Sequence, residues 1–168
     1  MRGPAWYGRI VNCIMNILMC ALLATYVLWT VQHVPGNESL PIFTPLSWFV
    51  SFIDSFFVGM FVGDWIPGFA WGQKIAGSLK LKGLPNYMVS VFVLCFVMVT
   101  SISFICTFIS NVQTIGMNGV IASWIMVYPG LLGLGYVLQL CTLWLAFKAA
   151  AAISGFDPAA APAEGPQA

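Results

Sequence analysis

The sequence predicts an all-α integral membrane protein, built as a bundle of four helices. Of its 168 residues, 60% are hydrophobic and only 7% are charged, and the mean hydropathy is +0.92. Such a chain has too little polar surface to cover a water-exposed exterior. The apolar residues form four long stretches, and all six Lys and Arg residues lie on one side of the pattern that these stretches make. Together these observations indicate four crossings of a lipid bilayer.

Each of the four apolar stretches is long enough to cross a membrane as a helix. A spanning helix needs roughly 20 apolar residues, because each residue adds about 1.5 Å toward about 30 Å of hydrocarbon. The predicted spans are residues 10–31, 46–70, 87–110 and 119–147. The last stretch is longer than one crossing needs, so we expect it to tilt or to extend into the cytoplasm.

The placement of the basic residues predicts how the chain is threaded. Cytoplasmic loops of membrane proteins retain cations, so the segments that carry Lys and Arg are expected inside, together with both termini. These residues are Arg2 and Arg9 before the first span, Lys74, Lys80 and Lys82 between the second and third, and Lys148 after the fourth. The outer connections, residues 32–45 and 111–118, contain no Lys or Arg.

The inner connection and the end of the chain have their own signals. The inner connection is expected at residues 72–86, and Pro85 is suited to the first turn of the third helix. We expect an Ala-rich turn or two to extend the last helix after Lys148, and residues 154–168 to form a disordered Pro/Ala-rich tail.

The two halves of the chain resemble each other, which predicts a tandem repeat of a two-helix hairpin. The hairpins are residues 1–83 and 84–153. Aligning the second half with the first places Ser47-Trp48 on Ser123-Trp124 and Gly59 on Gly135. Both hairpins would have the same orientation, so a pseudo-symmetry axis would run along the membrane normal. The alternative is that any four-helix hydropathy pattern looks periodic.

The second half of the first hairpin also carries a family resemblance. Its strings are Trp48-Phe49-Val50-Ser51-Phe52, Phe57-Val58-Gly59 and Gly63-Asp64-Trp65-Ile66-Pro67, followed by Trp71-Gly72-Gln73-Lys74. With Phe96-Val97-Met98-Val99, Ser101, Ser103 and Tyr128-Pro129, they resemble small bacterial membrane proteins grouped as domain of unknown function 2798, often a tandem two-helix unit. The resemblance covers most of residues 10–150. It implies this architecture and a bacterial cytoplasmic membrane location, but no activity.

Asp54 is the most costly residue for a bilayer. It lies about eight residues inside the second span, hence about 12 Å deep, where an ionised carboxylate costs roughly 2.5–3.5 kcal/mol. It could be a proton-relay or cation-coordinating group, or a neutral acid hydrogen-bonded to Asn12, Asn16 or a hydroxyl of the third helix. The candidate intramembrane polar site comprises Asp54, Asn12, Asn16, Ser51, Ser101 and Gln139, with Thr100 and Ser103 in a wider lining.

The remaining candidates concern helix packing and the inner interface. Gly59 and Gly63 lie one turn apart, which allows close approach of another backbone. With Gly130, Gly133 and Gly135 after Pro129, they predict that the second and fourth helices form the central contact, a ligand cleft being the alternative. Asp64 is expected to form an interfacial ion pair with Lys74, although an acid beside the helix break at Pro67 could also make an ion site.

Several function classes are disfavoured. A net charge of +1 argues against nucleic-acid binding. The cysteines lie in predicted helices without a Cys-x-x-Cys pair, and one histidine, His33, lies in a loop, so neither a metal site nor a cofactor is expected. No nucleophile and base are paired, so we expect no enzyme.

Two interpretations remain. The first, slightly favoured because intramembrane polar residues are few, is a non-catalytic accessory or interaction subunit. Its partners would be the lipid bilayer and either further copies of itself or another membrane protein. The second is a small transporter or channel that uses Asp54, and that would need a dimer or a larger assembly because four short helices enclose little water.

Overall fold

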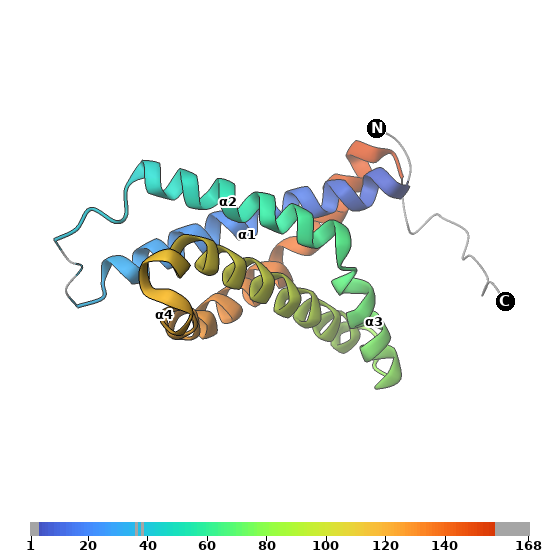
Figure 1. Ribbon diagram of the computed structural model, residues 1–168. Coiled ribbons are helices and arrows are strands. Elements are labelled where there is room, and N and C mark those ends of the chain that lie inside the picture. The colour runs from blue at the N-terminus through green and yellow to red at the C-terminus, as the bar shows by residue number, and fades with distance from the viewer. Residues whose placement is uncertain (1–3, 36, 38, 157–168) are drawn as a thin grey trace.

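The protein is all-helical throughout the part that its structure, a computed structural model, describes. Residues 4–35, 37 and 39–156 are described, and no strand occurs among them. The helices are α1 (Pro4–Gln32), α2 (Pro45–Trp65), α3 (Gly68–Ser78) and α4 (Leu84–Ser154) (Figure 1). Three of them, α1, α2 and α4, are long and apolar enough to cross a membrane. The prediction of an all-α membrane protein is confirmed at this level.

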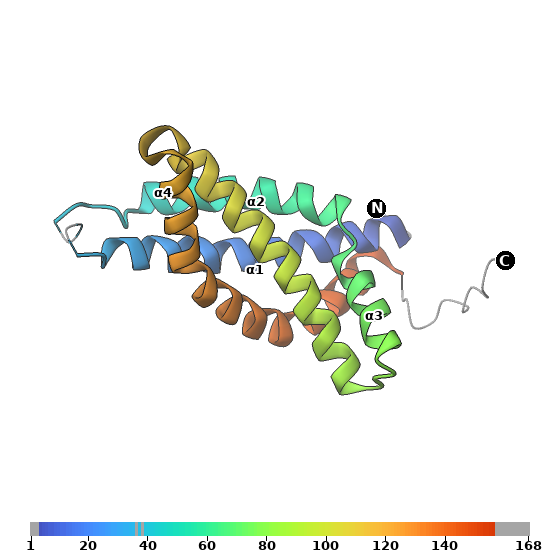
Figure 2. The same cartoon turned by 60° about the horizontal axis from the view of Figure 1, so that its bottom comes forward.

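Helix α4 consists of two arms that meet at Gly116. At this residue φ is 67° and ψ is 176°, a backbone conformation that is open essentially only to glycine. The chain reverses there, and the second arm returns toward the end of the molecule at which α1 begins (Figure 2). The predicted loop over residues 111–118 is therefore wrong, because one glycine makes the reversal and the residues on both sides stay helical.

The predicted second span, residues 46–70, is wrong at its inner end. Helix α2 ends at Trp65, and Ile66 is extended, with φ −110° and ψ 109°. Proline disfavours a helical conformation in the residue before it, and Pro67 has no N–H to donate to the carbonyl of Gly63. The chain then resumes as α3, so part of the inner connection predicted at residues 72–86 is a short helix rather than a loop.

The starts of α2 and α4 agree with their sequence signals. The Thr44 side chain accepts a hydrogen bond from the Ser47 N–H at 3.1 Å, and Ser47 Oγ accepts one from the Thr44 N–H at 3.0 Å. This reciprocal cap satisfies two N–H groups that would otherwise lack partners, and such caps contribute about 1 kcal/mol. Pro85 lies in the first turn of α4, as predicted.

The core lies between α1 and the two arms of α4. Met19 of α1, Ile102 of the first arm and Leu131 of the second arm are each at most 1% exposed and belong to one cluster. Helix α3 packs on the first arm, where a Cβ at Gly72 would lie 2.6 Å from the Ser90 Cα. Helix α2 covers the core less completely, and only Ser55, Gly59 and Val62 of it are buried.

The described cations gather at one end of the molecule. The beginning of α1, helix α3 and the end of α4 lie together there, whereas the α1–α2 connection and the Gly116 turn lie at the opposite end (Figure 1). The cations are Arg9, Lys74, Lys80, Lys82 and Lys148. We call this end the basic end. Arg2 and residues 157–168 of the predicted tail lie outside the described residues, and the Ala-rich extension of the last helix is confirmed as far as Ser154.

Two of these cations lie over tryptophan rings. The Lys148 Nζ is 3.9 Å from the ring centre of Trp144, and the Arg9 Cζ is 6.0 Å from that of Trp6. A cation over an aromatic face is attracted by the ring quadrupole. These pairs combine a charge and an amphipathic ring, which is typical of residues at a membrane surface.

Candidate functional site

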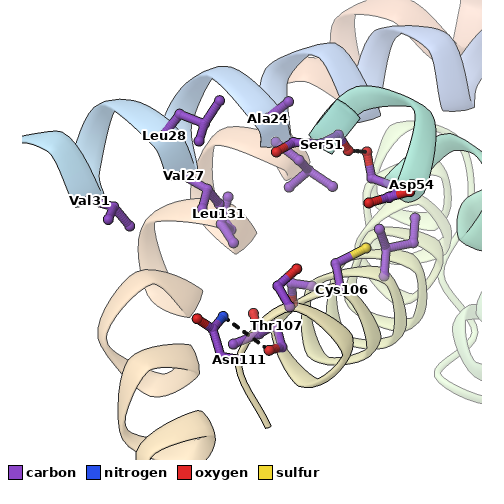
Figure 3. Close-up of a pocket in the computed structure, with 15 residues that line it drawn as sticks. Ala24, Val27, Leu28, Val31, Ser51, Asp54, Cys106, Thr107, Asn111 and Leu131 are labelled. Atoms are coloured by element: carbon purple, nitrogen blue, oxygen red, sulfur yellow. Dashed lines mark hydrogen bonds between the residues drawn. The ribbon is translucent and has the colours of Figure 1, made fainter. Parts of the chain in front are cut away.

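A cavity of about 250 Å³ adjoins Asp54, between α1, α2 and the first arm of α4 (Figure 3). Its lining comes from four helical segments. The lining residues are Leu23, Ala24, Val27, Leu28 and Val31 of α1, Ser51, Asp54 and Ser55 of α2, Ile102, Ser103, Cys106, Thr107, Ser110 and Asn111 of the first arm, and Leu131 of the second. We call it the Asp54 cavity. One wall is apolar, and the other carries most of the oxygen atoms.

Asp54 is the only carboxylate among the described residues that line this cavity. Because α2 is shorter than predicted, Asp54 lies near the middle of the helix, about 15 Å from either end. Figure 3 shows its side chain at one rim of the cavity, on the same side as Cys106. No Lys, Arg or His of the described chain lines the cavity, so the residues around Asp54 supply no opposite charge.

Two of the serine hydroxyls that line the cavity use their hydrogens within their own helices. Ser55 Oγ donates to the Ser51 carbonyl at 2.7 Å, and Ser103 Oγ donates to the Val99 carbonyl. Asn111 likewise donates to a carbonyl of its own helix, at 3.1 Å. A serine hydroxyl has one hydrogen and two lone pairs, so the oxygens are left with acceptor capacity. These oxygens, together with the carboxylate, offer acceptors to a cation in the cavity.

Asn12 and Asn16 have partners other than Asp54. Asn12 Nδ2 donates to Asp64 Oδ1 at 3.1 Å, and Asn16 Nδ2 donates to Asn12 Oδ1 at 2.6 Å. This chain of amides runs toward the basic end, along the contact between α1 and α2. Neither asparagine is hydrogen-bonded to Asp54, so the structure does not support the interpretation in which one of them stabilises a neutral Asp54. The ion pair of Asp64 with Lys74 stays a prediction, and both side chains are exposed.

The glycines of α2 receive these same asparagines. A Cβ added at Gly59 would collide with Asn16 Oδ1, and one added at Gly63 would collide with Asn12 Oδ1. Within the chain, the helix that these glycines admit is therefore α1, and not the second arm of α4. Their assignment to helix packing stays a prediction, as does a contact of the second and fourth helices between subunits.

The glycines after Pro129 differ among themselves. A Cβ at Gly130 would collide with the Tyr26 hydroxyl of α1, and one at Gly135 would lie 3.0 Å from Val99 Cγ2 and 3.1 Å from Met19 Cε. Gly133 has nothing within 4 Å of that position. Two of the three thus permit close packing against α1 and the first arm, and Gly133 does not serve this purpose.

The six residues of the predicted polar site are divided by the structure. Asp54 and Ser51 line the Asp54 cavity, whereas Asn12, Asn16 and Gln139 line a second cavity at the basic end. Ser101 lines neither of the two. The predicted polar site lacked several polar residues of the first arm that line the Asp54 cavity, namely Cys106, Thr107, Ser110 and Asn111. With Ser103, these residues recur at helical spacing, and that spacing predicts a polar stripe on one face of the helix.

Asp54 with serine oxygens could hold a single cation, but a multidentate metal site is not found in the described part of the chain. Within residues 4–35, 37 and 39–156, no three His, Cys, Asp or Glu side chains come together. Cys106 is the one thiol of the Asp54 cavity, and it is partly buried and free.

Comparison with known proteins leaves the family open. No protein-family model, no curated protein sequence and no solved structure matches the chain. The resemblance to domain of unknown function 2798 therefore stays a prediction.

Proposed function

We propose that the chain is a four-pass integral membrane protein that binds a small organic cation at Asp54 and passes it across the membrane. Both termini would lie on the cytoplasmic side, and the cavity would open toward the outer half of the bilayer. The observation that carries the proposal is the cavity of about 250 Å³ on which Asp54 has no opposite charge from the described residues.

The number of crossings follows from the division of α4 at Gly116. Each arm of α4 is longer than the roughly 20 residues that a crossing needs, and the chain reverses between the arms. With α1 and α2, this supports four crossings. The gathering of Arg9, Lys74, Lys80, Lys82 and Lys148 at one end supports a cytoplasmic basic end.

The chemistry of the lining supports an organic cation over a bare metal ion. One carboxylate and several hydroxyl oxygens can receive an ammonium group, while Leu23, Val27 and Leu131 offer apolar surface to a short carbon chain. A small metal ion would need more charged or carbonyl oxygens than this cavity offers. An intramembrane acid that faces a cavity is commonly part of a substrate or ion pathway.

Flux into liposomes tests this function. The purified full-length protein is reconstituted, and uptake of radiolabelled methylammonium and choline is measured beside protein-free vesicles. We expect uptake to depend on the protein and to fall at least about tenfold in Asp54→Asn, because a hydrogen bond to a charged group contributes about 1.5–3 kcal/mol and the substitution removes the only carboxylate among the described lining residues.

Asp64→Asn is the matched control for this experiment. It removes the same charge from the same helix at the basic end, where Asp64 lines neither cavity and accepts a hydrogen bond from Asn12. We expect Asp64→Asn to keep most of the flux. Uptake of neither cation, or equal uptake by the wild type and Asp54→Asn, would contradict the proposal.

An accessory or interaction role has separate support from the outer face of α2. Phe57, Phe61 and Trp65 recur one turn apart and are 67%, 65% and 75% exposed, and the rings of Phe61 and Trp65 stack at 5.5 Å. Such a stripe faces either lipid or another subunit, including a second copy of the chain. Size measurement in detergent with Phe57→Ala and Phe61→Ala would decide between these two, since only a subunit contact predicts a change in mass.

A further inference from the structure

A second cavity, of about 310 Å³, lies at the basic end between α1, the α2–α3 break and both arms of α4. We call it the basic-end cavity. It shares no lining residue with the Asp54 cavity. The amides Asn12, Asn16 and Gln139 are its polar side chains, and no Asp, Glu, Lys or Arg lines it among the described residues. Its ligand would therefore be uncharged.

Packing within the chain does not explain why a polar residue, Gln139, is buried at this position. Gln139 is 2% exposed, it lines the basic-end cavity, and its buried side-chain oxygen, Oε1, accepts no hydrogen bond from the described residues. A buried amide oxygen without a partner is destabilising, so it is normally retained where water or a ligand completes it. The Oδ1 of Asn16, which lines the same cavity, also lacks a partner, but this side chain is held by α2: its Nδ2 is bonded to Asn12, and its Oδ1 lies where a Cβ of Gly59 would be.

A second acceptor in this cavity comes from the helix break. Pro67 has no N–H, so the carbonyl of Gly63, four residues earlier, loses the donor that a continuous helix would provide. Gly63 and Pro67 both line the cavity. A ligand hydroxyl placed here could donate its one hydrogen to Gln139 Oε1, the buried oxygen that lacks a partner, with the Gly63 carbonyl as a second acceptor nearby.

The walls favour an aromatic body for the ligand. Met15, Met19 and Met98 line the cavity, and methionine sulfur makes favourable contacts with aromatic rings while its side chain adapts to their shape. Phe69 and Phe147 also line it and meet edge to face at 5.7 Å. Aromatic rings favour this geometry with each other, so a further ring fits beside the pair.

The volume sets the size of the ligand. An apolar cavity of about 150 Å³ holds one benzene ring, and the basic-end cavity is about twice as large. We infer that the basic-end cavity binds an uncharged molecule of about two aromatic rings that carries one hydrogen-bonding oxygen, with Gln139 as the residue that recognises this oxygen. This site is independent of the cation pathway through the Asp54 cavity.

Binding of 1-naphthol and naphthalene separates the hydrogen bond from the apolar contact. The full-length protein in detergent is titrated with each compound by calorimetry, and the heat of empty micelles is subtracted. We expect saturable binding of 1-naphthol at least about tenfold tighter than binding of naphthalene, because one hydrogen bond to a buried amide is worth about that factor. In Gln139→Leu, the two compounds should bind alike.

Gln73→Leu is the matched control, since Gln73 is exposed on α3 and does not line the cavity. Gln73→Leu should keep the preference for 1-naphthol. Asp54→Asn should keep it too, so a result against the basic-end cavity can be distinguished from a result against the cation site. Absence of saturable 1-naphthol binding, or an unchanged preference in Gln139→Leu, would overturn the inference.

Gly8→Leu provides a second variant in case Gln139→Leu does not fold. Gly8 lines the cavity and is exposed, and a Cβ there meets nothing within 4 Å, so leucine would add bulk at the edge of the cavity without a clash at its Cβ. We expect it to weaken binding of both compounds. Unreduced 1-naphthol binding in Gly8→Leu would place the compound elsewhere and overturn the assignment.

Discussion

Asp54 occupies the middle of an apolar helix, where an ionised carboxylate is costly unless polar groups adjoin it. The Asp54 cavity supplies such groups on the first arm of α4, whose Ser103 and Asn111 direct their hydrogens to backbone carbonyls. These oxygens and the carboxylate together offer acceptors to a group that enters the cavity, which favours a cation.

The close contact of Gly59 with Asn16 predicts that a side chain at residue 59 would lower the stability of the protein. Gly59→Ala would force the Asn16 amide out of its position, and overpacking of this kind costs about 1–3 kcal/mol. Thermal unfolding in detergent would measure the loss. Gly133→Ala is the control, because a Cβ there meets nothing within 4 Å and should leave the midpoint nearly unchanged. Equal effects of the two substitutions would show that the α1–α2 contact is looser than described.

At the scale of the elements, apolar length predicted the helices well but not their junctions. The break at Ile66-Pro67 and the reversal at Gly116 each depend on one or two residues, whereas hydropathy averages over a whole span. Proline in the sequence signalled the first junction. Nothing in the composition around Gly116 distinguished a glycine with positive φ from the neighbouring Gly119, since that choice is made by how the two arms pack.

Gly116 should therefore be the glycine of α4 least tolerant of a side chain. Its φ of 67° with ψ of 176° is strained for any L-residue, and such strain costs about 1–3 kcal/mol. We expect Gly116→Ala to lower the thermal midpoint clearly, although a Cβ there has open space around it. Gly133→Ala again serves for comparison. A neutral Gly116→Ala would mean that the arms are joined by a different backbone conformation.

At the scale of the whole molecule, the charged residue of the cavity could be predicted from the sequence, but the site around it could not. Asp54 was recognisable because a lone acid in an apolar stretch is conspicuous. The prediction that Asp54 shares one site with Asn12, Asn16 and Gln139 was wrong. How far apart these residues lie along the bundle axis depends on the register and tilt of the helices, which the sequence does not show. The structure instead has two cavities toward opposite ends, one with a carboxylate and one with neutral amides.

Cys106 offers the most direct measurement of the central claim, since it lines the Asp54 cavity beside the carboxylate. In a variant that keeps Cys106 as its only cysteine, right-side-out vesicles are treated with membrane-impermeant methanethiosulfonates, one cationic and one anionic. We predict that the cationic reagent reacts from outside at least about tenfold faster than the anionic one, that Asp54→Asn removes this preference, and that methylammonium slows the reaction. Reaction only from the cytoplasmic side, or equal rates for both reagents with Asp54 present, would contradict an outward-facing cation site.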